Sequence, residues 1–194
     1  MGRRPTFDTA DVVRASRDLF WDRGFDGTSL PDLEAVTGLA RSSLYHAFGS
    51  KRGLFDAAVD DYLSEVVAPR LALLTGPGGP DAYFAYLARD LAAADERRRG
   101  CLLVDTTAGP AARDDALAAV VTSYRRRLFD AFCTALTARG DRDVETTARV
   151  LTTMNIGALA LARVDRDEAL AVVAAARRVA TPPADVSEAH APGR

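Results

Sequence analysis

Two short helical segments separated by a tight turn constrain this chain more than any other feature of its sequence. Ser29 is expected to begin the first segment, because Ser29 and Asp32 have the spacing of a capping box, and Gly38 is expected to end it. The second segment is expected over residues 40–47. The turn between them, residues 37–39, contains a glycine that adopts positive φ at little steric cost. This layout is typical of a helix-turn-helix, whose second helix enters the major groove of DNA.

The expected second helix has two chemically different faces. At about 100° per residue, Ala40, Leu44 and Ala47 share an arc suited to packing on the preceding helices. The other arc carries side chains of the types that contact DNA: Arg41, Ser42, Tyr45 and His46. Arginine bonds guanine in bidentate fashion, serine bonds bases or phosphates, and the other two reach phosphate oxygens. Lys51 follows at the start of the next expected helix, where free N–H groups also favour a phosphate.

The stretch from Gly24 to Lys51 resembles the N-terminal domain of TetR-family regulators. The most specific part is the run Leu44-Tyr45-His46-Ala47-Phe48-Gly49-Ser50-Lys51. The close resemblance covers residues 7–55, and the remainder is similar only in its helical layout and length. Two positions depart from the family pattern, namely Ser42, where glycine is frequent, and Ala47, where an aromatic residue or histidine is frequent. These departures make the base preference unreadable.

The resemblance implies a homodimer in which the last two helices of each subunit form a four-helix bundle. It implies a ligand pocket in the helices between, and release of double-stranded DNA when a small-molecule effector binds. Repression from a palindromic operator is the expected outcome. Carried over position by position, the resemblance indicates these DNA contacts: Thr28, Arg41, Ser42, Ser43, Tyr45, His46 and Lys51.

The rest of the chain predicts an all-α protein. Alanine, leucine and arginine dominate, and apolar residues recur at three- and four-residue spacing. Trp21 is expected to pack between the first and fourth helices. Pro69 and the Pro/Gly-rich segment 75–80 are expected to break the chain. The expected helices cover 9–23, 29–38, 40–47, 50–67, 81–94, a short segment from 101, 114–138, 144–164 and 167–180.

These elements predict a helix-turn-helix domain over residues 1–48 and an effector-binding and dimerisation domain over 49–180. The Pro- and Ala-rich residues 181–194 are expected to be a disordered tail. Charged residues make up 27% of the chain and hydrophobic residues 48%, which argues against wholesale disorder. The net charge of −2 gives no chain-wide signature of nucleic-acid binding, so the cations that matter must be local, as at Arg3-Arg4 and Lys51-Arg52.

Several classes of protein are disfavoured. The two cysteines are too few for a disulfide framework, which together with the absence of a signal peptide predicts a cytoplasmic protein. No apolar run approaches the roughly 18 residues that span a bilayer, so no membrane partner is expected. Zinc-ligand spacing, a nucleophile elbow and phosphate-binding glycine loops are missing from the sequence. We therefore expect no enzyme activity, metal or cofactor.

Polar and aromatic side chains in the middle of the chain are candidates for a sensing pocket. Those on helices that would wall a cavity are Tyr83, Tyr86, Tyr124 and Asn155. Aromatic residues at helical spacing also build ordinary cores, and both alternatives stay open. Asn155 interrupts an apolar helix, either as an orienting group in the pocket or as a hydrogen bond at a dimer seam. The aromatic content favours an apolar or aromatic effector.

Cys101 gives an alternative function. It follows Gly100 at an expected helix start, behind three arginines, and both features would lower the pKa of its thiol. It could therefore line the pocket as a sensor of electrophiles or oxidants, or it could be a small buried core residue. A further alternative is an all-α ligand-binding protein without DNA binding. Arg41, Tyr45 and Lys51 argue against it, because such a protein would have a degraded recognition helix.

Overall fold

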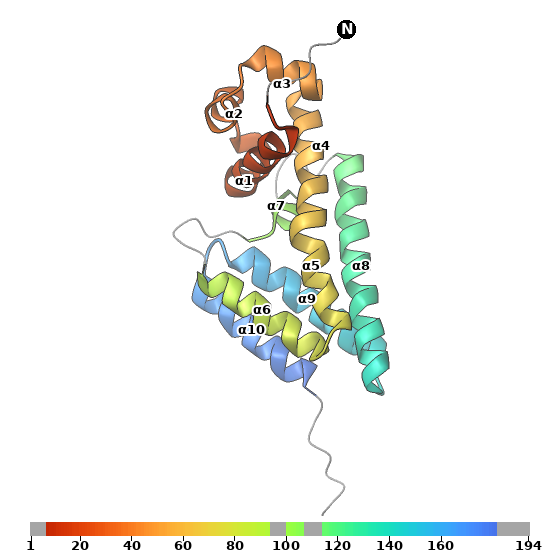
Figure 1. Ribbon diagram of the computed structural model, residues 1–194. Helices are drawn as coiled ribbons and strands as arrows, with labels where there is room; N and C mark the ends of the chain where they lie inside the picture. Colours follow the sequence, from red (N-terminus) through yellow and green to blue (C-terminus); the bar gives the residue numbers. More distant parts are fainter. Residues whose placement is uncertain (1–6, 94–99, 107–113, 182–194) are drawn as a thin grey trace, which may run out of the picture.

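The computed structural model describes residues 7–93, 100–106 and 114–181, and every element in these ranges is helical (Figure 1). The expected all-α class is confirmed. Arg3-Arg4, the arginines at 97–99 and the expected tail beyond residue 181 lie outside the described residues. In chain order the elements are α1 (Thr9–Gly27), α2 (Leu30–Thr37), α3 (Arg41–Phe48), α4 (Lys51–Tyr62), the π-helix η1 (Leu63–Val67), α5 (Ala68–Thr75), α6 (Gly79–Ala93), α7 (Leu102–Thr106), α8 (Asp115–Arg139), α9 (Val144–Leu161) and α10 (Arg166–Ala180).

Side-chain caps fix where several helices begin. The predicted capping box is present at α2, where the Ser29 hydroxyl accepts from the Asp32 N–H and the Asp32 carboxylate accepts from the Ser29 N–H. At α4 the Ser50 hydroxyl accepts from the Gly53 N–H, and at α8 the Asp114 carboxylate accepts from the N–H groups of Ala116 and Leu117. Each such cap stabilises its helix by about 1 kcal/mol. Gly24 interrupts α1 with φ 72° and ψ 170°, so the predicted stop is confirmed as a kink, after which one more turn runs to Gly27.

Helices α1, α2 and α3 form a head at one end of the molecule, and α4 leads from it into the helical body (Figure 1). The core of the head continues into α4, because the Phe55 ring meets the rings of Phe20 and Phe25 edge-on, each at 5.0 Å. Leu33 and Leu44 anchor α2 and α3 on this core and are almost fully buried. The core of the head therefore includes the first turns of α4.

The prediction that the chain breaks at Pro69 is wrong. Helix α4, η1 and α5 follow one another without a gap, so the helical path runs from Lys51 to Thr75. In η1 the hydrogen-bond register widens, and the Ala68 N–H bonds to the Leu63 carbonyl five residues earlier. Pro69 is the second residue of α5, directly after η1, so the widened register stands where proline cannot donate the bond of a regular α-helix.

Helix α7 lies between the head and the body and contacts α1, α4, α8 and α9 (Figure 1). Helix α9 packs on α8 and α10, and α10 packs on α6 (Figure 1). Arg163, just beyond α9, reaches the head: its guanidinium donates to the backbone carbonyls of Trp21 and Asp22 and to the Asp105 carboxylate. Head and body are therefore joined by hydrogen bonds as well as by the α4–α5 path.

Gly53 is required where α3 meets α4. A Cβ on Gly53 would stand 2.1 Å from the Phe48 carbonyl oxygen, so Gly53→Ala must force the two helices apart. We expect a loss of about 1–3 kcal/mol in the free energy of unfolding, measured by urea denaturation. Gly27→Ala is the matched control, because its Cβ would meet only the Arg23 Cβ at 3.7 Å. Equal stabilities for the two variants would contradict this packing.

Candidate DNA-binding and sensing sites

The turn between α2 and α3 fixes the direction of α3. Gly38 adopts the left-handed conformation with φ 68° and closes α2 by donating its N–H to the Glu34 carbonyl. The Glu34 side chain accepts the Arg41 backbone N–H at 2.6 Å. Because Ala40 provides no side-chain cap, this carboxylate takes its place and ties the first turn of α3 to α2. The orientation of α3 is therefore fixed by its hydrogen bond to α2.

The structure places the predicted DNA-contacting side chains of α3 on one exposed face. Arg41, Ser42, Tyr45 and His46 are exposed and Ser43 is half-buried, whereas Leu44 is only 3% exposed. The Arg41 guanidinium lies over the Tyr45 ring, 5.4 Å from its centroid. This face combines a cation with hydroxyl and imidazole groups that bond phosphates and base edges.

Lys51 and Thr28 occupy different environments. Lys51 begins α4, three residues after α3 ends at Phe48, and its Nζ lies 4.4 Å from the centroid of the Phe25 ring. Thr28 is only 1% exposed, and its hydroxyl donates to the Gly24 carbonyl at 2.7 Å. The side chain of Thr28 thus closes the kinked end of α1.

Four of the five side chains predicted to sense a ligand form a buried polar cluster. Tyr83, Cys101, Tyr124 and Asn155 are each at most 5% exposed. The Tyr83 hydroxyl donates to Asn155 Oδ1 at 2.9 Å. Asn155 therefore belongs to the interior of the subunit, which corrects the dimer-seam alternative. Burial raises the pKa of both tyrosines, so they stay protonated.

The sequence analysis missed Tyr62 in this cluster. Its hydroxyl donates to the Cys101 Sγ at 3.4 Å, and its ring packs edge-on against Trp21 at 4.8 Å. The ring contact confirms the predicted packing of Trp21 between the first and fourth helices. The apolar residues around Tyr62 at helical spacing could have placed it on an inner face of α4, but nothing in the pattern specified a polar contact there.

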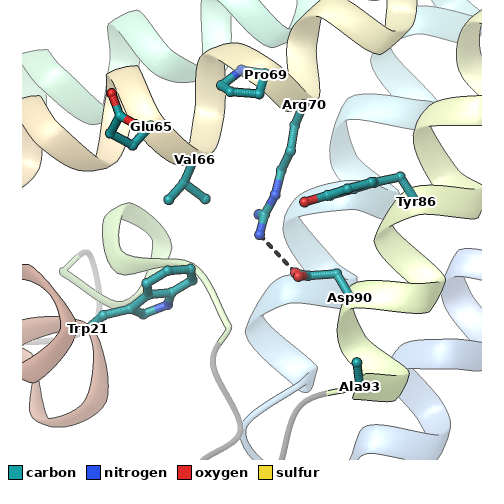
Figure 2. Close-up of a pocket in the computed structure, with 8 residues that line it drawn as sticks. All are labelled: Trp21, Glu65, Val66, Pro69, Arg70, Tyr86, Asp90 and Ala93. Carbon is teal, nitrogen blue, oxygen red and sulfur yellow. Dashed lines mark hydrogen bonds and ion pairs between the residues drawn. The ribbon is translucent and has the colours of Figure 1, made fainter.

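Tyr86, the fifth predicted residue, lies outside the buried cluster and lines an open cleft between α1, the η1–α5 path and α6 (Figure 2). The cleft has a volume of about 340 Å³. Arg70 crosses it to the Asp90 carboxylate, which accepts at 2.8 Å. Sequence reasoning missed Arg70 because it follows Pro69, where a break in the chain was expected.

Cys101 is fully buried, and burial raises the pKa of its thiol. The Tyr62 hydroxyl and the N–H groups of Leu103 and Val104 act in the opposite direction but do not outweigh burial. The predicted lowering of this pKa is therefore wrong, because the helix start that surrounds the thiol is also buried.

The reactivity of Cys101 follows from this environment. Near neutral pH we expect an alkylating thiol reagent to label native Cys133→Ser protein, which keeps Cys101, more slowly than Cys101→Ser protein, which keeps the half-buried Cys133. Because the pKa of Cys101 is raised, its thiolate stays scarce below the folded-state pKa, and labelling should wait for opening of the body. Rapid labelling of native Cys101 would instead support the thiol-sensing alternative.

The described part of the chain contains no helix with both the length and the apolar character of a bilayer-spanning segment. Within the same ranges, no group of three or more His, Cys, Asp or Glu side chains is arranged to hold a metal ion.

A helix-turn-helix head joined to a helical body is the architecture of a one-component DNA-binding regulator, and comparison with known proteins agrees with it. Residues 12–58 match the family model described as bacterial regulatory proteins, tetR family. The HTH-type transcriptional regulator YezE of Bacillus subtilis is 31% identical over 178 residues, which cover 86% of this chain and 92% of YezE. The chain therefore belongs to the TetR family of DNA-binding transcriptional regulators.

Two other relatives extend the comparison. The HTH-type transcriptional repressor ComR of Escherichia coli is 33% identical over 120 residues, covering 58% of this chain and 57% of ComR. The TetR-family regulator CifR, solved as a cysteine variant complexed with a 26-bp double-stranded operator, has a TM-score of 0.76 and 31% identity over 91% of this chain and 98% of its own. The similarity to CifR extends over both head and body.

Proposed function

We propose that this chain is a homodimeric repressor that binds a near-palindromic operator through α3 and leaves it when a small-molecule effector binds the body. The observation that carries the proposal is the exposed face of α3, with Arg41, Ser42, Tyr45 and His46 outward and Leu44 buried. Similarity to CifR, which was solved on operator DNA, supports this role for the head. We further propose that residues 1–48 act as the DNA-binding unit and 49–180 as the sensing and dimerisation unit.

The outward faces of α9 and α10 support dimerisation. Residues at three- and four-residue spacing on α9 are small or apolar and at least partly exposed: Val150, Thr153, Gly157, Ala160 and Val164 just beyond it. Helix α10 presents Ala171, Ala174 and Ala175 in the same way. A Cβ on Gly157 would have no atom within 4 Å, so the α9 backbone is open to close approach at this point. Small side chains let helices of two copies pack tightly.

Contacts between the head and the body support transmission of an effector signal. Arg163 holds the end of α1 to α7 through Asp105, and Arg52 at the start of α4 pairs with Asp114 at the start of α8. A change in the body can therefore alter the spacing of the two heads in a dimer, which must be about 34–36 Å to match successive major grooves. An effector acts only through its different affinity for the two spacings.

The first test is a selection of bound sequences from a random double-stranded DNA pool at two salt concentrations. We expect enrichment of two inverted half-sites one helical turn apart, and an affinity for them that falls as salt rises. Enrichment of a single half-site would contradict the dimeric operator. Uniform, weak and salt-sensitive binding without enrichment would contradict sequence-specific regulation altogether.

A further inference from the structure

The cleft lined by Trp21, Val66, Pro69, Arg70, Tyr86 and Asp90 has the features of a ligand site. It touches the head through Trp21 of α1, the helical path through η1 and α5, and the body through α6 (Figure 2). Its volume of about 340 Å³ lies within the usual range of small-molecule sites. An occupant would therefore contact the head and the body at once.

Arg70 supplies a cation with unused hydrogen-bonding capacity. Its side chain is only 9% exposed, yet it lines the cleft. One terminal nitrogen donates to Asp90, while the buried Nε has no acceptor among the described residues. A guanidinium carries five N–H donors in a planar fork that matches a carboxylate. A ligand carboxylate would provide acceptors for the donors that Asp90 leaves unused.

Two aromatic rings border the cleft near this cation. Trp21 stands across the cleft from Tyr86 and Asp90, with Arg70 between them (Figure 2). Tyr86 is 37% exposed, and its ring centroid lies 6.0 Å from the Arg70 guanidinium carbon. Val66 and Pro69 add apolar surface. A planar apolar group would fit between these walls.

The charges favour an acid over an amine. Among the residues that line the cleft, one guanidinium, that of Arg70, stands with the carboxylates of Asp90 and Glu65, and Asp90 is already paired with Arg70. A cationic group placed in the cleft would stand beside the almost completely buried guanidinium of Arg70. Glu65 also lines the cleft, but it is exposed and its charge is screened by water. The Asp90 side chain is 39% exposed, so water can solvate its carboxylate when another acid takes its place on Arg70.

We propose that this cleft binds a small aromatic carboxylic acid, whose carboxylate pairs with Arg70 in competition with Asp90 and whose ring lies between Trp21 and Tyr86. That this acid acts as the effector rests on the proposed function. Arg70 follows η1 by three residues on the path that starts at the head, and Asp90 belongs to α6 of the body. When the ligand replaces Asp90 on Arg70, the ion pair between α5 and α6 is lost next to the π-helix.

Trp21 is the only tryptophan of the chain, so its fluorescence reports occupancy of the cleft in the full-length protein without DNA. The probe is 3-phenylpropanoate, and 3-phenylpropan-1-ol and 3-phenylpropylammonium are the neutral and cationic controls. We expect a saturable change in Trp21 fluorescence with the acid, an affinity about 10-fold weaker for the alcohol and none for the amine. Preference for the amine, or no saturable change with any of the three, would overturn the proposal.

Variants test the competition between the two carboxylates. We expect Asp90→Ala to bind the acid about 3- to 10-fold more tightly, because the internal partner of Arg70 is removed, and Arg70→Gln to lose binding. Asp60→Ala, which removes an exposed carboxylate of α4 outside the cleft, is the matched control and should stay within about 2-fold of the wild type. Weaker acid binding in folded Asp90→Ala protein, or an equal gain in Asp60→Ala, would overturn the role of the ion pair.

Operator affinity then tests the regulatory role. A saturating acid is expected to weaken binding to the selected operator in the wild type and not in Arg70→Gln. If the operator is selected but the acid never binds, this inference fails while the proposed function stands. If the acid binds but no operator is selected, the proposed function fails, while the proposal that the cleft binds an aromatic acid is supported. Acid binding that leaves operator affinity unchanged would overturn its role as the effector.

Discussion

Replacing Arg41 with alanine is expected to reduce specific operator affinity by about 30- to 20,000-fold while leaving the fold intact. A bidentate arginine–guanine pair contributes about 1–3 kcal/mol of discrimination, and a dimer would lose two of them. The backbone N–H of residue 41 would keep its bond to the Glu34 carboxylate, because the substitution leaves the main chain unchanged. Fluorescence anisotropy with the selected operator measures the loss, and circular dichroism checks the helical content.

Two controls separate base reading from charge. Arg126→Ala removes the same charge from α8, where the side chain is 80% exposed, and should leave operator affinity within about 2-fold. Arg41→Lys keeps the charge but loses the planar fork, so it should retain salt-sensitive binding to random DNA and lose the preference for the operator. If Arg41→Lys bound the operator as the wild type does, Arg41 would be a phosphate contact.

The sequence was most informative where structure depends on near neighbours. The capping box of Ser29 and Asp32, the stop at Gly38 and the burial of Leu44 could all be predicted, because caps, turns and helical faces are set within a few residues. The exposure of Arg41, Tyr45 and His46 follows from the same periodicity, but Ala40 and Ala47, which were expected on the packing arc, are also exposed. The burial of Thr28 depends on how the kinked end of α1 folds back, which no local pattern encodes.

The sensing region was predicted less well because it depends on contacts between distant segments. Tyr83 and Asn155 are far apart in the sequence, yet the structure joins them by a hydrogen bond in the core. The path through Pro69 was misread because a proline in the first turn of a helix and a proline that ends a helix look alike in sequence. Because a break was expected at Pro69, the next residue, Arg70, was not predicted to line a site.

Replacing Ala160 with glutamate is expected to separate the proposed dimer into folded monomers. Ala160 lies on the outward face of α9 among small side chains, so in a two-fold interface each new carboxylate would be buried against the partner without a counter-charge. Such a group costs about 4 kcal/mol or more, which raises the dissociation constant at least about 1,000-fold. Light scattering should report a mass falling from twice 20.7 kDa to 20.7 kDa.

Ala118→Glu places the same charge on an exposed position of α8 and should leave the wild-type mass unchanged. Ala160→Glu should also lose operator affinity, although α3 itself is untouched, because a monomer engages only one half-site. It should keep the weak, salt-dependent binding to random DNA that its intact head provides, whereas Arg41→Ala should stay a dimer. A dimeric Ala160→Glu protein would place the interface on another face and would remove the geometric reason for the predicted half-site spacing.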